Sequence, residues 1–190
     1  MIEILEPGLE CSVQDRGRDP QFIAMTWAPT GAFDTLAYRF SNLLVGNEPG
    51  DFPLVSTGRG ELASGTAGPL NTLHGAQLRG TEPHRDAVTA GDLQPKLNGV
   101  AAPLWQEIEV KAGDVLECGA ARRGMRMYLG VQGGITAPVI AGARSTFVLC
   151  YLGGPFGRSL RAGDLLSVDK PQTGGAKQRK LPKSRWPEYA

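Results

Sequence analysis

The stretch Ala112-Gly113-Asp114-Val115-Leu116 recurs as Ala-Gly-Asp-Leu-Leu at 162–166 and, shortened, as Ala-Gly-Asp-Leu at 90–93. Glycine adopts positive φ at little steric cost and aspartate hydrogen-bonds its own backbone, so Gly-Asp between apolar segments is typical of a turn. Three such turns indicate short strands that reverse repeatedly. Their uneven spacing favours a recurring hairpin turn over a solenoid repeat. Pro95 follows the first copy closely and interrupts a strand there.

The composition is typical of a turn-rich β protein. The 26 glycines and 14 prolines make up about a fifth of the 190 residues, against roughly 12% in an average protein. A chain of this length fits one domain with a core of its own. The net charge of +1 gives no support for nucleic acid or a membrane surface as a partner. No apolar run approaches the roughly 18 residues of a membrane span, and no signal peptide precedes the first strand, so we expect a cytoplasmic protein.

Cysteine and histidine are too sparse to indicate a metal or thiol site. Cys11, Cys118 and Cys150 form no CxxC pair, which is typical of free thiols in a reducing compartment. The chain has two histidines and no clustered carboxylates. We therefore expect no metal site.

One clear helix is predicted at about 35–45. Asp34 is a suitable N-cap, Gly46 stands where a left-handed C-cap belongs, and Pro49 prevents the helix from continuing. Helical spacing predicts one face that packs on a sheet, formed by Leu36, Phe40, Leu43 and Leu44, with Ala37 beside them.

Short strands are predicted for much of the remaining chain. The chain opens with a hairpin or a strand-turn-strand around Pro7-Gly8. Residues 125–131 alternate between apolar and other side chains, as in a half-buried antiparallel strand. The other candidates are 54–57, 68–74, 77–78, 107–110, 115–118, 147–149 and 165–168.

Two pairs of polar segments are candidates for a binding site. The first pair is 13–18 with 29–34. Arg18 could fork onto a carboxylate while Asp15 orients it, and the helix that begins at Asp34 would add positive potential. The alternative is that Asp15 pairs with a neighbouring arginine to fix a loop, while Asp34 only caps the helix.

The second pair is 129–135 with 142–146. Gly133-Gly134 allows close backbone approach, and the side chains of Arg144, Ser145 and Thr146 could hold a phosphate or carboxylate. The alternative is a glycine-rich hairpin followed by a capped turn. Ser145 lies in no G-x-S-x-G elbow, so a serine nucleophile is not supported.

Taken in order, these segments resemble the KipA, or allophanate hydrolase subunit 2, family, whose members are also called biotin-dependent carboxyltransferase-like proteins or the C subunit of 5-oxoprolinase. The resemblance runs from Met1 to about Val168 and implies a mainly β, cyclophilin-like β-barrel with the one helix. It assigns the barrel to residues 1–169 and a linker or tail to 170–190, where scattered basic residues and prolines indicate a solvated connector. The matching positions are 7–9, 13–15, 17–18, 29–34, Ala37, Asn42, 44–47, 128–129, 133–135, 142–146, 153–154 and 157–164.

The resemblance implies a subunit of an ATP-dependent 5-oxoprolinase or allophanate-hydrolase-type complex, which binds a small carboxylate or amide beside a KipI or subunit-B-like partner. Two alternatives are a non-catalytic module that regulates a KipI-like partner and a biotin-dependent carboxyltransferase domain of the urea carboxylase type. No motif for a bound cofactor is present; ATP would serve the complex, and biotin only the carboxyltransferase alternative. Whether the chain is itself catalytic, and whether it forms a homo-oligomer, is left open. The expected substrate-binding residues are Gln14, Asp15, Arg18, Asp34, Gly133, Gly134, Arg144, Ser145 and Thr146.

The chain also departs from the family pattern. Val55, His74 and Gln132 stand where members often have glutamate, threonine and arginine. Loss of an acid and a cation from a polar cleft would weaken catalysis, which favours a binding or scaffold role. Members usually run on for roughly a hundred further residues, a length within one domain's range, so we expect a fragment or a truncated member.

Overall fold

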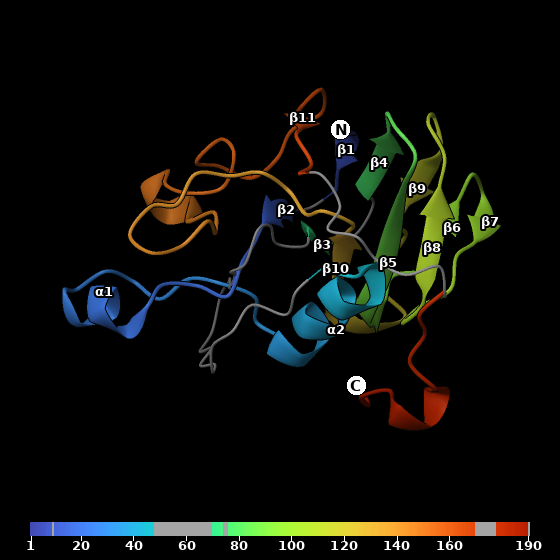
Figure 1. The fold of residues 1–190 in the computed structure, drawn as a ribbon, viewed down its shortest axis with the longest axis horizontal. Helices are drawn as coiled ribbons and strands as arrows, with labels where there is room; N and C mark the ends of the chain where they lie inside the picture. Colours follow the sequence, from blue (N-terminus) through green and yellow to red (C-terminus); the bar gives the residue numbers. More distant parts are fainter. Residues whose placement is uncertain (9, 48–69, 74–75, 170–177, 190) are drawn as a thin grey trace.

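The computed structural model describes residues 1–8, 10–47, 70–73, 76–169 and 178–189, and its strands form two antiparallel sheets (Figure 1). The predicted strand at 54–57, with Val55, and the family position His74 lie outside the described residues. The first sheet has the order β11-β1-β4-β9-β6-β7, with β11 Leu165–Leu166, β1 Ile2–Pro7, β4 Ala76–Gly80, β9 Val115–Glu117, β6 Lys96–Leu97 and β7 Val100–Ala101. The second has the order β2-β3-β10-β5-β8, with β2 Glu10–Val13, β3 Leu70–Leu73, β10 Arg123–Val131, β5 His84–Asp92 and β8 Glu107–Val110.

The two sheets share one hydrophobic core. Ile2, Leu78 and Leu116 come from the first sheet, and Val88 and Leu129 come from the second; all five belong to one buried cluster. Such apolar burial is the main favourable term in folding. The paired strands do not close into a barrel within the described part of the chain, so the fold is mainly β with two open sheets, and its likeness to cyclophilins stays a prediction.

Helix α2 (Thr35–Val45) confirms the predicted helix at both ends. Asp34 accepts a hydrogen bond from the Ala37 amide at 2.9 Å, and Gly46 ends the helix in the left-handed conformation with φ 81°. The predicted face is confirmed only in part, because Ala37 and Leu44 are buried whereas Leu36 and Leu43 are exposed. The buried face of the helix consists of Ala37, Tyr38, Ser41, Asn42, Leu44 and Val45.

Strand β10 explains that change of face. Met127, Leu129 and Val131 point into the shared core, as the alternation predicted. Tyr128 and Gly130, on the other face, are also buried, because α2 packs against β10 and β5. The predicted antiparallel strand is therefore confirmed, but residues 127–131 are buried on both faces and not half-buried, and Met125 is exposed. The absence of a side chain at Gly130 lets the backbone of α2 approach the sheet.

Two of the three Ala-Gly-Asp copies form the same turn. Asp114 and Asp164 each donate their amide to the carbonyl three residues earlier at 3.1 Å, and each carboxylate accepts the amide of that same residue at 2.8 Å. The copy at 90–92 is not a turn but the end of β5, opposite an irregularity in β10. There Ala90 has φ 73°, and a Cβ on Gly91 would lie 2.7 Å from the Arg126 carbonyl oxygen.

Two other local predictions need correction, and one open choice is decided. β1 and β2 belong to different sheets, so of the two predicted openings the strand-turn-strand is the one that forms. The predicted strand at 147–149 is instead a 3-10 helix, η1 (Val148–Cys150). A short helix that was not predicted, α1 (Pro20–Ala24), follows the polar segment 13–18. Residues 178–189, with the 3-10 helix η2 (Lys183–Arg185), pack against the domain and are not a solvated connector.

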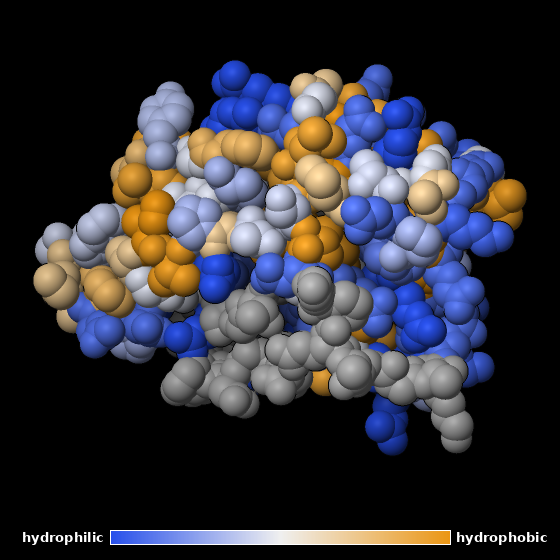
Figure 2. All heavy atoms as spheres, turned by 45° about the horizontal axis from the view of Figure 1, so that its top comes forward, coloured by the Kyte–Doolittle hydropathy of each residue, from blue (hydrophilic) through white to orange (hydrophobic). Residues whose placement is uncertain are grey.

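One end of the molecule carries exposed apolar side chains. Helix α1 has no buried residue. Ile23 within α1 and Met25 just after it are exposed, as are Leu149 within η1 and Tyr151 just after it. Figure 2 shows apolar surface gathered at the left end, where α1 and η1 lie in Figure 1. Apolar clusters of this kind mark contact surfaces for other proteins more often than scattered single residues do. No helix in the described ranges is long and apolar enough to cross a membrane.

Candidate functional site

Asp15 joins the two predicted polar segments. Its carboxylate accepts hydrogen bonds from the Gly17 amide at 3.1 Å, from the Arg144 amide and from the Ser145 hydroxyl. The Asp15 amide in turn donates to the Ser145 hydroxyl oxygen at 3.1 Å. Thr146 binds the carbonyl of Val13 through both its amide and its hydroxyl. The structure thus brings Gln14, Asp15, Arg144, Ser145 and Thr146 together as a clamp between two loops.

Burial sets the electrostatics of this clamp. Asp15 is 1% exposed, and this desolvation raises the pKa of its carboxyl group to about 6, although the hydrogen bonds from Ser145, Arg144 and Gly17 oppose the rise. A carboxyl group that titrates near pH 6 can exchange protons at physiological pH. Its oxygens are engaged by protein donors, so the geometry favours a structural role.

Two buried polar atoms beside the clamp lack hydrogen-bond partners among the described residues. Gln14 donates to the Ser12 hydroxyl at 2.7 Å, but its Oε1 atom has no partner, nor has the Thr30 hydroxyl. The amide of Ala32 reaches the Asp15 carbonyl at 3.4 Å, so both atoms belong to segments that meet at the clamp. Unsatisfied buried groups of this kind mark places where water or a ligand can bind.

The predicted pair of arginines binds main-chain carbonyls. Arg18 donates to the Ala28 carbonyl at 2.7 Å and lies over the rings of Trp27 and Phe147, at 5.2 and 5.3 Å from their centroids. The Arg144 guanidinium donates to the Ala137 carbonyl. Both arginines thus stabilise the loops around the clamp, and a role in holding a substrate carboxylate stays a prediction.

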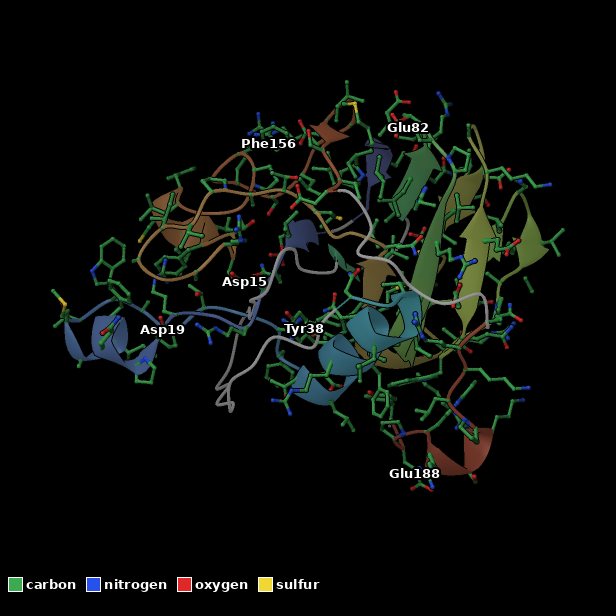
Figure 3. The ribbon with its side chains drawn as sticks, viewed as in Figure 1. Asp15, Asp19, Tyr38, Glu82, Phe156 and Glu188 are labelled. Atoms are coloured by element: carbon green, nitrogen blue, oxygen red, sulfur yellow. The ribbon has the colours of Figure 1, made fainter. Side chains whose placement is uncertain are left out.

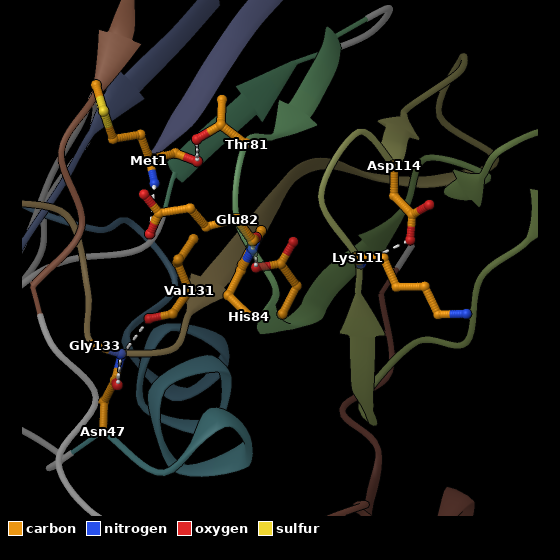
Figure 4. A network of polar contacts seen from close by, with 10 residues as sticks. Met1, Asn47, Thr81, Glu82, His84, Lys111, Asp114, Val131 and Gly133 are labelled. Atoms are coloured by element: carbon orange, nitrogen blue, oxygen red, sulfur yellow. Dashed lines mark hydrogen bonds and ion pairs between the residues drawn. The ribbon is translucent and has the colours of Figure 1, made fainter.

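Gly133 and Gly134 lie in a different place, at the end of β10. The Gly133 amide donates to the Asn47 side-chain oxygen at 2.8 Å, while the Asn47 side-chain nitrogen donates to the Val131 carbonyl at 2.8 Å (Figure 4). The Gly134 amide donates to the Val131 carbonyl at 2.9 Å. The Gly133 amide therefore fixes the turn after β10 to the loop after α2, and the Gly134 amide closes the turn itself. The predicted approach of both amides to a ligand stays a prediction.

Asp34 belongs to the lining of a pocket of about 490 Å³ that contains none of the clamp residues. In Figure 3, Asp15 and Glu188 lie in different parts of the view, and Glu188 precedes the pocket residue Tyr189 in the chain. The pocket volume falls in the range of small-molecule sites. The first turn of α2 borders it, and such a turn presents N–H groups and partial positive charge. The lining is Phe33, Asp34, Thr35, Leu36, Ala90, Gly124, Met125, Arg126, Tyr128 and Tyr189.

The polar groups of this pocket come from three parts of the chain. The Asp34 carboxylate accepts hydrogen bonds from the Ala37 amide and from the Tyr189 hydroxyl, and the Asp34 amide donates to the Tyr128 hydroxyl oxygen at 2.9 Å. Burial raises the pKa of Tyr128 to about 12 and raises that of Tyr189 as well. Both phenols are therefore protonated at neutral pH. The Arg126 guanidinium lies 5.1 Å from the centroid of the Phe33 ring.

Sequence reasoning missed three of these pocket residues. Arg126 and Tyr128 lie on β10, where the alternation assigned them to a solvent face, and Tyr189 lies in the predicted tail. The signal for Tyr128 was available, because a tyrosine buried beside a helix N-terminus usually bonds through its hydroxyl. Such an arrangement can hold a carboxylate or an amide. Within the described ranges no three histidine, cysteine or acidic side chains gather as metal ligands.

Comparisons with known proteins point to one family. The model of the family described as carboxyltransferase domain, subdomain A and B, matches residues 65–190. Urea amidolyase of Saccharomyces cerevisiae is 33% identical over 165 residues, which cover 87% of this chain and 8% of that protein. The C subunit of 5-oxoprolinase from Escherichia coli is 32% identical over 173 residues, which cover 90% of this chain and 50% of that protein.

Solved structures agree with the sequence matches. The urea amidolyase of K. lactis superimposes with a TM-score of 0.83 at 30% identity, covering 100% of this chain and 11% of that one. The urea carboxylase of Kluyveromyces lactis superimposes with a TM-score of 0.79 at 29% identity, covering 100% of this chain and 16% of that one. The chain thus spans a small part of the amidolyases and about half of the oxoprolinase subunit.

Proposed function

Because this chain belongs to the carboxyltransferase domain family, subdomains A and B, we propose that it serves in a subunit of an ATP-dependent, amide-hydrolysing complex of the 5-oxoprolinase or allophanate-hydrolase type. In this proposal it acts in the cytoplasm and binds a small carboxylate or amide beside a KipI or subunit-B-like partner. The relatives named as the C subunit of 5-oxoprolinase support the subunit role. ATP would be used by the complex.

The pocket at the start of α2 carries this proposal. It offers a guanidinium from Arg126, two protonated phenols and the partial positive charge of a helix N-terminus around a largely apolar cavity. A substrate carboxylate would lie toward Arg126, and an amide group would bond the Tyr189 hydroxyl or the Asp34 carboxylate. These are binding roles, and hydrolysis would draw on groups supplied by the complex.

Replacement of Arg126 by glutamine tests the substrate site. Loss of a charged hydrogen bond weakens binding by about 1.5–3 kcal/mol, so we expect at least a tenfold increase in the Kd of 5-oxoproline, measured by calorimetry on the reconstituted complex. The matched control is Arg123→Gln, three residues earlier on β10 and outside the lining of this pocket. Equal affinity in Arg126→Gln and Arg123→Gln would remove the pocket as the substrate site.

The apolar end around α1 and η1 supports the proposed partner contact. Met25 and Tyr151 are 66% and 79% exposed, and we expect Met25→Glu with Tyr151→Glu to weaken binding of a subunit-B-like protein at least tenfold in a pull-down titration. Leu165→Glu, at an exposed apolar residue of β11, is the control. If the control and the double variant bind the partner equally, the partner docks elsewhere.

Carboxyl transfer is the second candidate function, and the high TM-scores to urea amidolyase and urea carboxylase favour it. In this case the substrate would be carboxybiotin on a separate carrier. Decarboxylation of carboxybiotin by the complex, measured beside ATP-dependent 5-oxoproline turnover, separates the two candidates. If the chain only regulates a KipI-like partner, the complex should form, but it should show neither carboxybiotin decarboxylation nor 5-oxoproline turnover.

A further inference from the structure

A second and larger hollow has a lining that shares no residue with the Asp34 pocket. This groove of about 710 Å³ is bordered by β6, the segment that follows β7, and residues 180–186. Figure 1 shows β6 and β7 at one side of the molecule, with the C-terminal segment below them. Leu104, Trp105, Leu181 and Trp186 contribute apolar surface to its lining. An apolar groove of this size can bury several side chains of a ligand.

The charged residues that line the groove have mostly one sign. Lys96 and Arg122 come from the domain and Lys180 and Lys183 from the C-terminal segment, whereas Asp92 is the one acidic residue of the lining. Within the described ranges none of these four cations forms an ion pair. The Asp92 carboxylate accepts the Gln94 amide at 2.9 Å. Cations gathered around a groove with low-dielectric walls attract and orient an anionic partner.

The backbone beside the groove already holds one extended segment. The Leu181 amide donates to the Trp105 carbonyl at 2.8 Å, and the Glu107 amide donates to the Arg179 carbonyl at 2.9 Å. β7 is the outer strand of its sheet in the described part of the chain, so its outer edge is open to a further extended chain. Trp105 has φ 57°, a conformation that is strained for a bulky residue and that concentrates at functional sites.

We propose that this groove binds an acidic, extended peptide segment of a partner protein. An extended chain points alternate side chains to opposite faces, so apolar side chains would enter between Leu104 and Leu181 while the intervening acidic ones meet the four cations. A free polyphosphate would leave the apolar lining unfilled. Nucleic acid does not fit a chain with a net charge of +1. The inference goes beyond the proposed amide chemistry and does not depend on it.

A phage library of random nonapeptides, selected against the full chain at low salt, tests this inference. We expect the enriched peptides to carry several Asp or Glu residues that alternate with apolar residues. The best of them, labelled with fluorescein, is then titrated by fluorescence anisotropy. Binding should weaken when the salt concentration rises, because exposed charges are screened. Absence of enrichment, or enrichment of neutral or basic peptides, would overturn the proposal.

Variants then locate the binding surface. Lys96→Gln with Lys183→Gln removes two exposed cations of the groove and should raise the Kd of the labelled peptide at least tenfold. The control Lys111→Gln with Arg161→Gln makes the same change in charge on the two Ala-Gly-Asp turns and should leave the Kd within twofold. Equal losses in the two double variants, or full competition by stoichiometric tripolyphosphate, would show general attraction of polyanions and contradict the peptide site.

Discussion

Replacement of Gly130 by alanine is expected to lower the free energy of unfolding by about 3 kcal/mol. This is the upper end of the roughly 1–3 kcal/mol that an extra carbon atom in a well-packed core usually costs. A Cβ at this position would lie 2.3 Å from the Ser41 carbonyl oxygen and 2.5 Å from the Ser41 carbonyl carbon. These are backbone atoms in the middle of α2, so rotation of a side chain cannot relieve the clash. The whole helix would have to move away from β10.

Gly119→Ala is the matched control for this prediction. A Cβ on Gly119 meets its nearest atom, the Leu93 carbonyl oxygen, at 3.6 Å, which is an ordinary contact. Gly-to-Ala changes at compatible positions are neutral or stabilising by up to about 1 kcal/mol, because the unfolded chain loses freedom. In a thermal melt we expect the Tm of Gly130→Ala to lie about 10 °C below that of Gly119→Ala, because each kcal/mol of lost stability lowers the Tm of a domain of this size by roughly 2–4 °C. Unfolding of both variants within 1 °C of each other would mean that α2 does not sit tightly on β10.

The same change links the fold to the proposed pocket. Helix α2 carries Asp34 at its start, and Tyr128 lies two residues before Gly130 on β10. A displaced helix therefore alters the distance between the Asp34 amide and the Tyr128 hydroxyl, which is 2.9 Å in the structure. The fraction of the Gly130→Ala variant that still folds should consequently bind 5-oxoproline more weakly than the Gly119→Ala variant does.

Local sequence signals identified those elements whose ends depend on nearby residues. Asp34 and Gly46 define α2 because capping needs a side-chain acceptor at one end and positive φ at the other. The turns at 111–114 and 161–164 follow from the same local chemistry. The hairpin between β6 and β7 was missed, although its Asn98-Gly99 turn, with φ 51° and 79°, is the strongest short-range hairpin signal.

The face of α2 could not be predicted from helical spacing alone. The buried face contains Tyr38, Ser41 and Asn42, whose polar atoms are satisfied inside the protein: the Ser41 hydroxyl and the Asn42 side-chain nitrogen both donate to the Tyr38 carbonyl. A pattern based on hydrophobicity counts such residues as exposed. It counts the exposed Leu36 and Leu43 as buried, because nothing in the helix itself shows which surface the sheet will cover.

The candidate sites show the same division between local and distant information. Asp15 and Ser145 were both proposed from the sequence, and they meet across 130 positions of chain. Asp34 was assigned to the same site as Asp15 because the helix that it begins would add positive potential there, but it bonds Tyr189, 155 positions away. Contacts over such separations depend on the order of strands within the sheets, which short motifs do not encode.

Replacement of Asp15 by alanine is the second change with a large expected effect. It leaves three donors without their acceptor, the amides of Gly17 and Arg144 and the hydroxyl of Ser145. A buried group left unsatisfied costs about 1–3 kcal/mol, so we expect the free energy of unfolding in urea to fall by about 4 kcal/mol. Thr30→Ala is the control, because it removes a buried hydroxyl that has no partner in the described part of the chain; a similar loss in both variants would contradict the clamp.

The Asp15→Asn variant distinguishes the effect of the buried charge from that of the hydrogen bonds. The comparison uses the pH dependence of the free energy of unfolding in the variant and in the wild type. The pKa of Asp15 rises from 3.8 to about 6 on burial, so the folded chain binds more protons than the unfolded chain between these values. The contribution of Asp15 to the free energy of unfolding therefore falls as pH rises from about 4 to 6, by about 3 kcal/mol at about 1.4 kcal/mol per unit of pKa, and does not change further above that range. Asparagine has no such titration, so the wild type should lose stability relative to Asp15→Asn over the same interval. A constant difference between the two proteins from pH 4 to 7.5 would show that the carboxylate is not desolvated, and the clamp would then be open to water.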